Sequence, residues 1–194
     1  MNNLDEHHED IAAGAGQAPQ PRKSPAVAWL RELLETLLPA AVIAIFINLF
    51  LAQSTVVLGQ SMESNLHPNQ RLVVEKVSYA LHAPRRGDIV VIKPRRPDET
   101  IPLIKRVVAL AGETIEIHGG QVYVDGKALD EPYLHQKTSG DMAPLVVPPL
   151  HIFVMGDNRA ASNDSRFFGP VPIKDVIGRA WISYWPPSEL RVLE

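Results

Sequence analysis

The sequence contains no cysteine, and this absence excludes several kinds of chemistry. Among its 194 residues no thiol is available to form a disulfide, bind zinc through sulfur, act as a nucleophile or carry a lipoprotein-type acyl chain. Because disulfide-free proteins occur on either side of a membrane, the absence does not identify the compartment.

An excess of basic residues, a phosphate loop and a histidine-based site are also lacking. The net charge is −3, so electrostatics give no reason to expect nucleic acid as a partner. No Gly-rich phosphate loop occurs, and no histidine after residue 53 lies in an HExxH pattern or beside an Asp-bearing motif. The sequence therefore predicts neither a metal nor another cofactor.

The N-terminal region combines a polar tail with one long apolar run. Residues 1–25 are acidic at first and then rich in Ala, Gly, Gln and Pro, which predicts a disordered cytoplasmic tail. Residues 33–52 form a mostly apolar stretch of 20 residues, about the length that spans a bilayer. Basic residues precede the run, and none occurs at residues 53–70, so the N-terminus is expected in the cytoplasm. We expect a single-pass anchor in the cell membrane over residues 26–52.

Two other interpretations of the apolar run remain open. A buried core helix is one, because only residues 37–52 are free of charge and that length is borderline for a span. A cleaved signal peptide is the other, and it needs small residues at the last and third-last positions before the cut. Cleavage after Ala52 would place Phe50 at the third-last position, so an uncleaved anchor fits better.

The chain after residue 53 is patterned like strands. Residues 114–118 and 121–125 alternate across Gly119-Gly120, which predicts a hairpin with a two-residue turn. No long amphipathic helix pattern occurs there, so residues 53–194 predict an all-β extracytoplasmic domain. The other predicted strands are short β-branched or aromatic runs at residues 72–77, 88–92, 104–108, 151–155 and 178–184.

Ser61 and Lys105 form the candidate catalytic pair. A serine hydroxyl attacks an amide only when another group removes its proton. A lysine among apolar strand residues can remove it, because burial disfavours the charged amine. Since Ile104 and Val107 flank Lys105 and Arg106, one of these two basic side chains is expected to point inward. Each motif alone is weak, because serines in turns and lysines on strands are common.

A third block, residues 156–169, concentrates charged residues. It contains two acids and two bases, Asp157, Arg159, Asp164 and Arg166, enough for a compact ion-pair network that holds Ser162 in place. The alternative interpretation is a polar surface loop.

Together these blocks resemble the bacterial type I signal peptidases, serine peptidases with a Ser-Lys dyad. The family's motif Ser-Met-x-Pro-Thr-Leu is matched by Ser61, Met62 and Leu66. Three further boxes follow in the family's order, at residues 86–91, 104–108 and 156–169. The resemblance spans about residues 53–185 and the preceding anchor, and four ordered boxes are far more specific than one motif.

The resemblance implies a role for each matched residue. Ser61 would be the nucleophile, Lys105 the general base, and Ser162 a hydrogen-bond partner that orients the lysine amine. The supporting ion pairs would be Asp164 with Arg166 and Asp157 with Arg106. The residues implied at the substrate pocket and oxyanion site are Gly59, Gln60, Met62 and Ile104.

The family also implies a fold and a substrate. The fold would be mainly β, a core of coiled antiparallel sheet with a small inserted β region at residues 114–150, after one transmembrane helix. The partners would be the lipid bilayer and exported preproteins with small residues at the last and third-last positions before the cut. Cleavage would take place at the outer face of the membrane.

Two positions depart from the family's pattern. Ser64-Asn65 replaces Pro-Thr, which concerns the stiffness of the turn rather than the nucleophile. Gly59 stands where Gram-negative relatives often carry a serine whose hydroxyl donates a hydrogen bond to the oxyanion. Here the Ser61 backbone N–H can still donate, and the sequence does not identify the second donor.

Two other functions fit part of the pattern. A self-cleaving repressor-type Ser-Lys peptidase shares the dyad but needs a DNA-binding or partner domain and a self-cleavage site. An inactive, membrane-tethered β-domain that binds peptide has no need of Ser61, Lys105 and Ser162 together. The anchor and the matched residues favour the signal peptidase.

Overall fold

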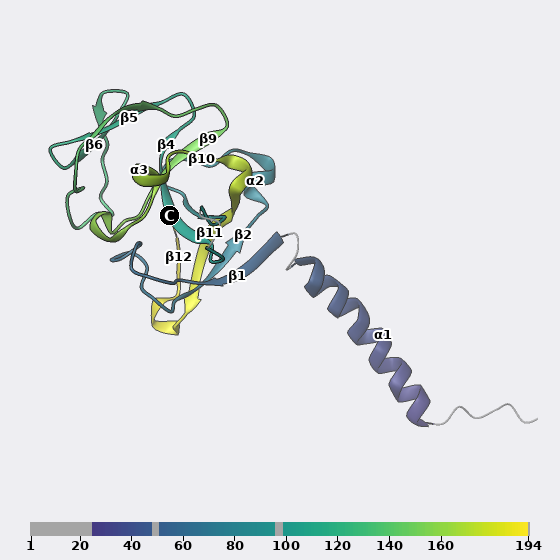
Figure 1. The fold of residues 1–194 in the computed structure, drawn as a ribbon. Helices are drawn as coiled ribbons and strands as arrows, with labels where there is room; N and C mark the ends of the chain where they lie inside the picture. Colours follow the sequence, from purple (N-terminus) through teal and green to yellow (C-terminus); the bar gives the residue numbers. More distant parts are fainter. Residues whose placement is uncertain (1–24, 48–50, 96–98, 194) are drawn as a thin grey trace, which may run out of the picture. The chain divides into compact units, whose positions relative to one another are not determined.

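The structure is a computed structural model that describes residues 25–47, 51–95 and 99–193 (Figure 1). The predicted tail, residues 1–25, lies almost entirely outside the described residues. Contacts divide the chain into two units, residues 1–41 and 42–194.

Helix α1 covers Pro25–Phe46 and contains Pro39. In the part of the chain that the structure describes, no helix is both long and apolar enough to cross a membrane. The predicted anchor includes residues 48–50, which lie outside the described residues. Its predicted last residue, Ala52, is instead the first residue of a strand, where it pairs with Glu75.

The larger of two antiparallel sheets has eight strands. Their order is β1-β2-β11-β3-β4-β9-β10, with β12 paired to β11. The central strand β3 is buried along its whole length. The strands are β1 (Ala52–Val56), β2 (Arg71–Glu75), β3 (Ile89–Ile92), β4 (Leu103–Leu110), β9 (His151–Met155), β10 (Val171–Pro172), β11 (Val176–Trp185) and β12 (Arg191–Val192).

The smaller sheet has four strands in the order β7-β6-β5-β8, and all four lie within residues 114–150. The predicted hairpin is confirmed, because His118 pairs with Gln121 across Gly119 and Gly120. Both glycines have positive φ, +61° and +79°, which a two-residue turn of this kind requires. The strands are β5 (Thr114–His118), β6 (Gln121–Val124), β7 (Lys127–Ala128) and β8 (Met142–Val146).

Short helices occupy some of the connections. They are α2 (Ser78–Leu81), α3 (Ser165–Phe168) and the 3-10 turns η2 (Arg159–Ala161), η3 (Ile173–Asp175) and η4 (Pro187–Glu189).

Two apolar clusters pack the segments near the predicted site against the sheets. Phe153 on β9 is fully buried with Ile115 and Ile117 of β5, so the two sheets share one core. Met62 and Leu66, in the segment between β1 and β2, pack in a second cluster under the larger sheet. This packing fixes the serine segment, residues 57–70, against the sheet that contains β4.

The mainly β architecture and the longer predicted strands are confirmed. Sequence patterning missed β1, β8 and the two-residue strands. The alternation of β8 is weak, because its residues are mostly exposed and Pro144 interrupts it. Strand β1 is missed because Gln53, Ser54 and Thr55 make it polar in the middle.

Candidate active site

The predicted pair meets in the structure. Lys105 Nζ donates a hydrogen bond to Ser61 Oγ over 2.7 Å, although the two residues are 44 positions apart. Lys105 comes from the middle of β4 and is 2% exposed. Ser61 is half-buried, so its hydroxyl lies at the boundary between the core and solvent.

Burial changes the chemistry of Lys105. Loss of water around the amine lowers the pKa of Lys105 from 10.5 to about 8. The carboxylates of Asp164 and Asp157 oppose this effect by favouring the charged amine, and they are outweighed. An amine with that pKa is partly neutral near neutral pH and can accept a proton from a hydroxyl.

The loop after β9 holds the backbone of Ser61. The N–H of Asn158 donates to the carbonyl oxygen of Ser61 over 3.0 Å. A Cβ on Gly156 would lie 2.4 Å from that carbonyl oxygen and 2.3 Å from Ser162 Oγ. Only glycine permits this close approach, which accounts for its place at the start of the third block.

The predicted pair of Asp157 and Arg106 is present and buried. Arg106 Nε and Nη2 donate to the two oxygens of Asp157 over 2.9 and 2.8 Å. Asn65 Nδ2 donates to the same carboxylate over 2.9 Å and to the carbonyl oxygen of Tyr133 over 2.8 Å. The asparagine that departs from the family motif therefore ties the serine segment to this ion pair.

Lys105 and Arg106 are both buried, whereas the sequence predicted that one of them points inward. Two adjacent basic residues on a strand face opposite sides. Each is accommodated because it has a partner on its own side, Ser61 for the amine and Asp157 for the guanidinium.

The second predicted pair, Asp164 with Arg166, is also present. Arg166 Nε and Nη2 donate to the two carboxylate oxygens over 2.8 and 2.9 Å. Asp164 is fully buried and accepts from the N–H of Gly156 over 3.0 Å. It therefore fixes the start of the loop that contacts Ser61.

Ser162 lies beside this loop with a buried hydroxyl. The residue is 7% exposed, and its Oγ has no hydrogen-bond partner among the residues that the structure describes. The implied hydrogen bond to the Lys105 amine is not formed here. The hydroxyl is instead close to Gly156.

The four residues predicted at the substrate pocket differ in exposure. Gly59 and Gln60 are exposed, whereas Met62 and Ile104 belong to the core cluster and are 1% and 7% exposed. Met62 thus lies beneath the serine segment. Gly59 has φ +80°, a conformation that side chains rarely adopt, which gives a backbone reason for glycine at this position.

The carboxylate partner of Arg159 was not expected from the sequence. It lies outside the third block, because the Arg159 guanidinium forms an ion pair with Glu131 and a hydrogen bond to Thr138. Both partners come from the connection between β7 and β8. Arg159 Nε also donates to the carbonyl oxygen of Gly156 over 3.1 Å.

Tyr133 joins the two arginine sites. Its ring lies under the Arg106 guanidinium at 4.1 Å, and its hydroxyl donates to Glu131 over 2.7 Å. The segment Glu131-Pro132-Tyr133 thus contacts both Arg106 and Arg159. No local pattern in the sequence indicated these contacts, because the partners are distant along the chain.

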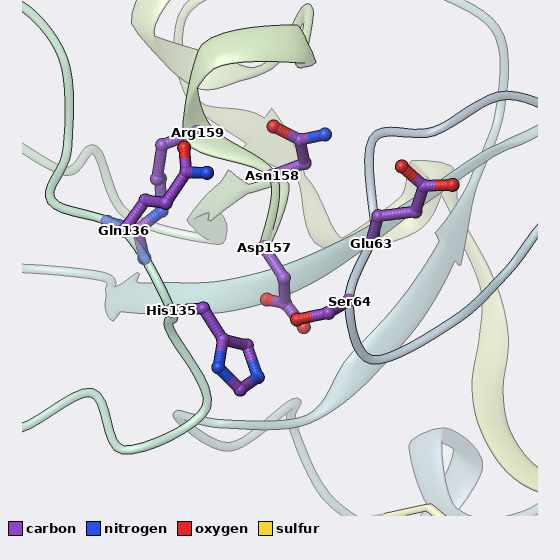
Figure 2. Close-up of a pocket in the computed structure, with 7 residues that line it drawn as sticks. All are labelled: Glu63, Ser64, His135, Gln136, Asp157, Asn158 and Arg159. Carbon is purple, nitrogen blue, oxygen red and sulfur yellow. The ribbon is translucent and has the colours of Figure 1, made fainter.

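A cavity of about 300 Å³ lies next to the serine segment (Figure 2). Its walls are formed by the serine segment, the connection between β7 and β8, and the loop after β9. The lining residues are Glu63, Ser64, His135, Gln136, Asp157, Asn158 and Arg159.

Known proteins resemble this chain over most of its length. The family model described as signal peptidase, peptidase S26, matches residues 30–185. The chain is 39% identical to signal peptidase I of Leptolyngbya laminosa over 167 residues, 83% of this chain and 82% of the relative. It is 38% identical to probable signal peptidase I-2 of Synechocystis, over 85% of this chain and 77% of the relative. A solved structure of a signal peptidase I from Enterococcus faecalis is 32% identical, with a TM-score of 0.46, and covers 50% of this chain and 97% of its own.

The buried Glu131–Arg159 pair gives a stability prediction. Removing the carboxylate in Glu131→Ala leaves a guanidinium that is 1% exposed without its counter-charge. We expect the free energy of unfolding to fall by about 3–5 kcal/mol, measured by urea unfolding of the full chain in detergent.

The double variant Glu131→Leu, Arg159→Met is expected to recover much of that loss, because neither charge is then buried alone. Asp141→Ala, which removes an exposed carboxylate, serves as the control. A loss in Glu131→Ala no larger than in this control would contradict the structural role of the pair.

Proposed function

The chain belongs to the signal peptidase family, peptidase S26, and on this basis we propose that Ser61 and Lys105 cleave signal peptides from exported preproteins. Its family and relatives identify it as a signal peptidase I, a serine endopeptidase. The main support for the dyad is the 2.7 Å hydrogen bond between a serine hydroxyl and a buried lysine amine.

In the proposed mechanism, the neutral Lys105 amine takes the proton of Ser61 as Oγ attacks the carbonyl carbon before the scissile bond. The resulting ammonium then gives that proton to the leaving amine, and the peptide bond breaks. An acyl-enzyme on Ser61 remains. Lys105 next takes a proton from a water molecule as the water oxygen attacks the ester, and the resulting ammonium gives that proton to Ser61 Oγ as the ester bond breaks. The signal peptide leaves with a new carboxyl group, which ionises in solvent.

The oxyanion of the intermediate needs donors close to Ser61. We assign one donor to the Ser61 backbone N–H. Gly59 supplies no side-chain donor, and its positive φ disfavours the serine that Gram-negative relatives often carry there.

The supporting residues act on the geometry of the dyad. Asp164 and Arg166 hold the loop that contacts Ser61, while the pair of Asp157 and Arg106 ties the same loop to strand β4. Ser162 is assigned to orient the amine during the reaction, because its buried hydroxyl is not hydrogen-bonded to any of the described residues.

The assigned substrate side lies along Gly59 and Gln60, with Ile104 behind it. Gly59 and Gln60 are exposed, which suits contact with an extended peptide, and the family resemblance implies that Met62 and Ile104, which are buried, form the floor of a shallow pocket. We therefore assign Ala, Gly or Ser to the last and third-last positions before the cut.

The apolar run that ends before strand β1 is assigned as a single-pass anchor with the N-terminus in the cytoplasm, on the basis of its composition and the charges before it. Ser61 follows Ala52 by nine residues, so an extended chain holds it within about 30 Å of the end of this run. Such a position suits a preprotein that emerges at the outer membrane surface.

Cleavage of a model preprotein in detergent tests the function. The wild-type chain is expected to cut after an Ala, while Ser61→Ala loses activity but stays folded. Phe at the last position before the cut is expected to slow cleavage strongly, because its ring does not fit over the buried floor. Cleavage by Ser61→Ala would refute the nucleophile, and peptide binding without wild-type cleavage would favour the inactive-domain alternative.

The lowered pKa of Lys105 predicts a pH profile. Because only the neutral amine accepts a proton, cleavage is expected to rise with pH through an apparent pKa of about 8. Lys105→Arg should be inactive at every usable pH, because arginine stays protonated. Initial rates between about pH 6 and pH 10 measure this. Lys127→Arg, at an exposed lysine, is the control, and near-normal activity of Lys105→Arg would exclude the general-base role.

The anchor assignment predicts how the full chain fractionates. The chain is expected to stay with membranes during alkaline carbonate extraction, because the apolar run is held by lipid. Protease added to the outer side should cut after residue 53 and spare the N-terminal tail. Recovery of the intact chain in the soluble fraction would rule out this topology.

A further inference from the structure

The cavity beside the serine segment has a polar lining and is not part of the dyad. Figure 2 shows Glu63 and Ser64 on one wall and His135 and Gln136 on the opposite wall, with Asp157 between them. Neither Ser61 nor Lys105 lines it. Its volume of about 300 Å³ is at the lower end of the range for ligand sites and suits one or two side chains.

The cavity begins next to the nucleophile. Glu63 follows Ser61 by two residues, so their Cα atoms lie at most about 7 Å apart. Asn158, which also lines the cavity, donates its N–H to the carbonyl oxygen of Ser61 over 3.0 Å. A peptide bound at Ser61 therefore reaches the cavity within one to three residues of the scissile bond.

The cavity also lies on a definite side of the dyad. The surface proposed for the signal peptide is formed by Gly59 and Gln60, which precede Ser61 in the chain. The cavity wall is formed by Glu63 and Ser64, which follow Ser61. The same order holds on β4, where Arg106 follows Lys105 and is paired with Asp157 of the cavity wall.

We propose that this cavity binds the first residues after the cut, the N-terminal end of the mature protein, and that Glu63 selects among them by charge. The proposal rests on the proposed function. A preprotein that lies along Gly59 and Gln60 and passes Ser61 in an extended conformation continues toward Glu63 and Ser64.

The charges of the lining support this occupant. Asp157 is neutralised by Arg106, and Arg159 by Glu131. Within the described part of the chain Glu63 donates its backbone N–H to Gln60, while its carboxylate takes part in no hydrogen bond or ion pair. The cavity thus offers one uncompensated carboxylate, which favours a basic side chain and disfavours an acidic one at the positions that follow the cut.

Charge reversal on both partners tests the proposal. Preproteins with Lys or Asp at the first, second or third position after the cut are compared by kcat/KM with the full wild-type chain. We expect Lys to be preferred over Asp by about two- to fivefold at one of these positions, as for a partly exposed ion pair. In Glu63→Lys the preference should reverse, and in Glu63→Gln it should fall to about one.

Two controls separate the outcomes. The same Lys and Asp at the tenth position after the cut lie beyond the cavity and should be cleaved equally. Asp141→Lys changes the charge of an exposed residue outside the lining and should keep the wild-type preference.

A wild-type chain that cuts no preprotein contradicts the proposed function itself. A chain that cuts preproteins, but whose charge preference is absent or unchanged in both Glu63 variants, refutes the cavity assignment alone. Glu63→Gln keeps the test valid if Glu63→Lys fails to fold, as judged by circular dichroism.

Discussion

The proposed role of Lys105 as general base depends on the removal of its amine from water. A lysine at its ordinary pKa cannot take a proton from serine near neutral pH, and burial on a central strand is what lowers that pKa. Water is excluded from the amine because β4 is an inner strand, which lies between β3 and β9 in the larger sheet. The serine must then come to the lysine, which the core packing of Met62 and Leu66 achieves.

The ion pairs near Ser61 and Lys105 fix the positions of loops. Three arginines, Arg106, Arg159 and Arg166, each meet a buried carboxylate and also bond to a backbone carbonyl oxygen. Such pairs add little net stability compared with apolar packing, but each one requires a defined geometry. The loop after β9 is therefore held against Ser61 by charge and hydrogen bonding rather than by apolar contact.

The smaller sheet contributes to this site through its connections. Its strands share a core with β9 through Phe153, and the connection between β7 and β8 supplies Glu131 and Tyr133. These two residues reach Arg159 and Arg106, so the added sheet stabilises the charged loops. The same connection forms one wall of the cavity beside the serine segment, at His135 and Gln136.

The sequence by itself determined the mainly β class, the longer strands and the Gly119-Gly120 hairpin, which follow from alternation and turn glycines. The pairing of Ser61 with Lys105 was expected from four ordered boxes that resemble a known family, because each motif alone is weak. Only the tertiary structure decided that Lys105 and Arg106 are both buried, that Asn65 binds Asp157, and that Arg159 pairs with Glu131. Local periodicity predicts which face of a strand a residue occupies, but not which distant residue it contacts. Whether a charged side chain can be buried depends on that contact, because a buried charge needs a partner.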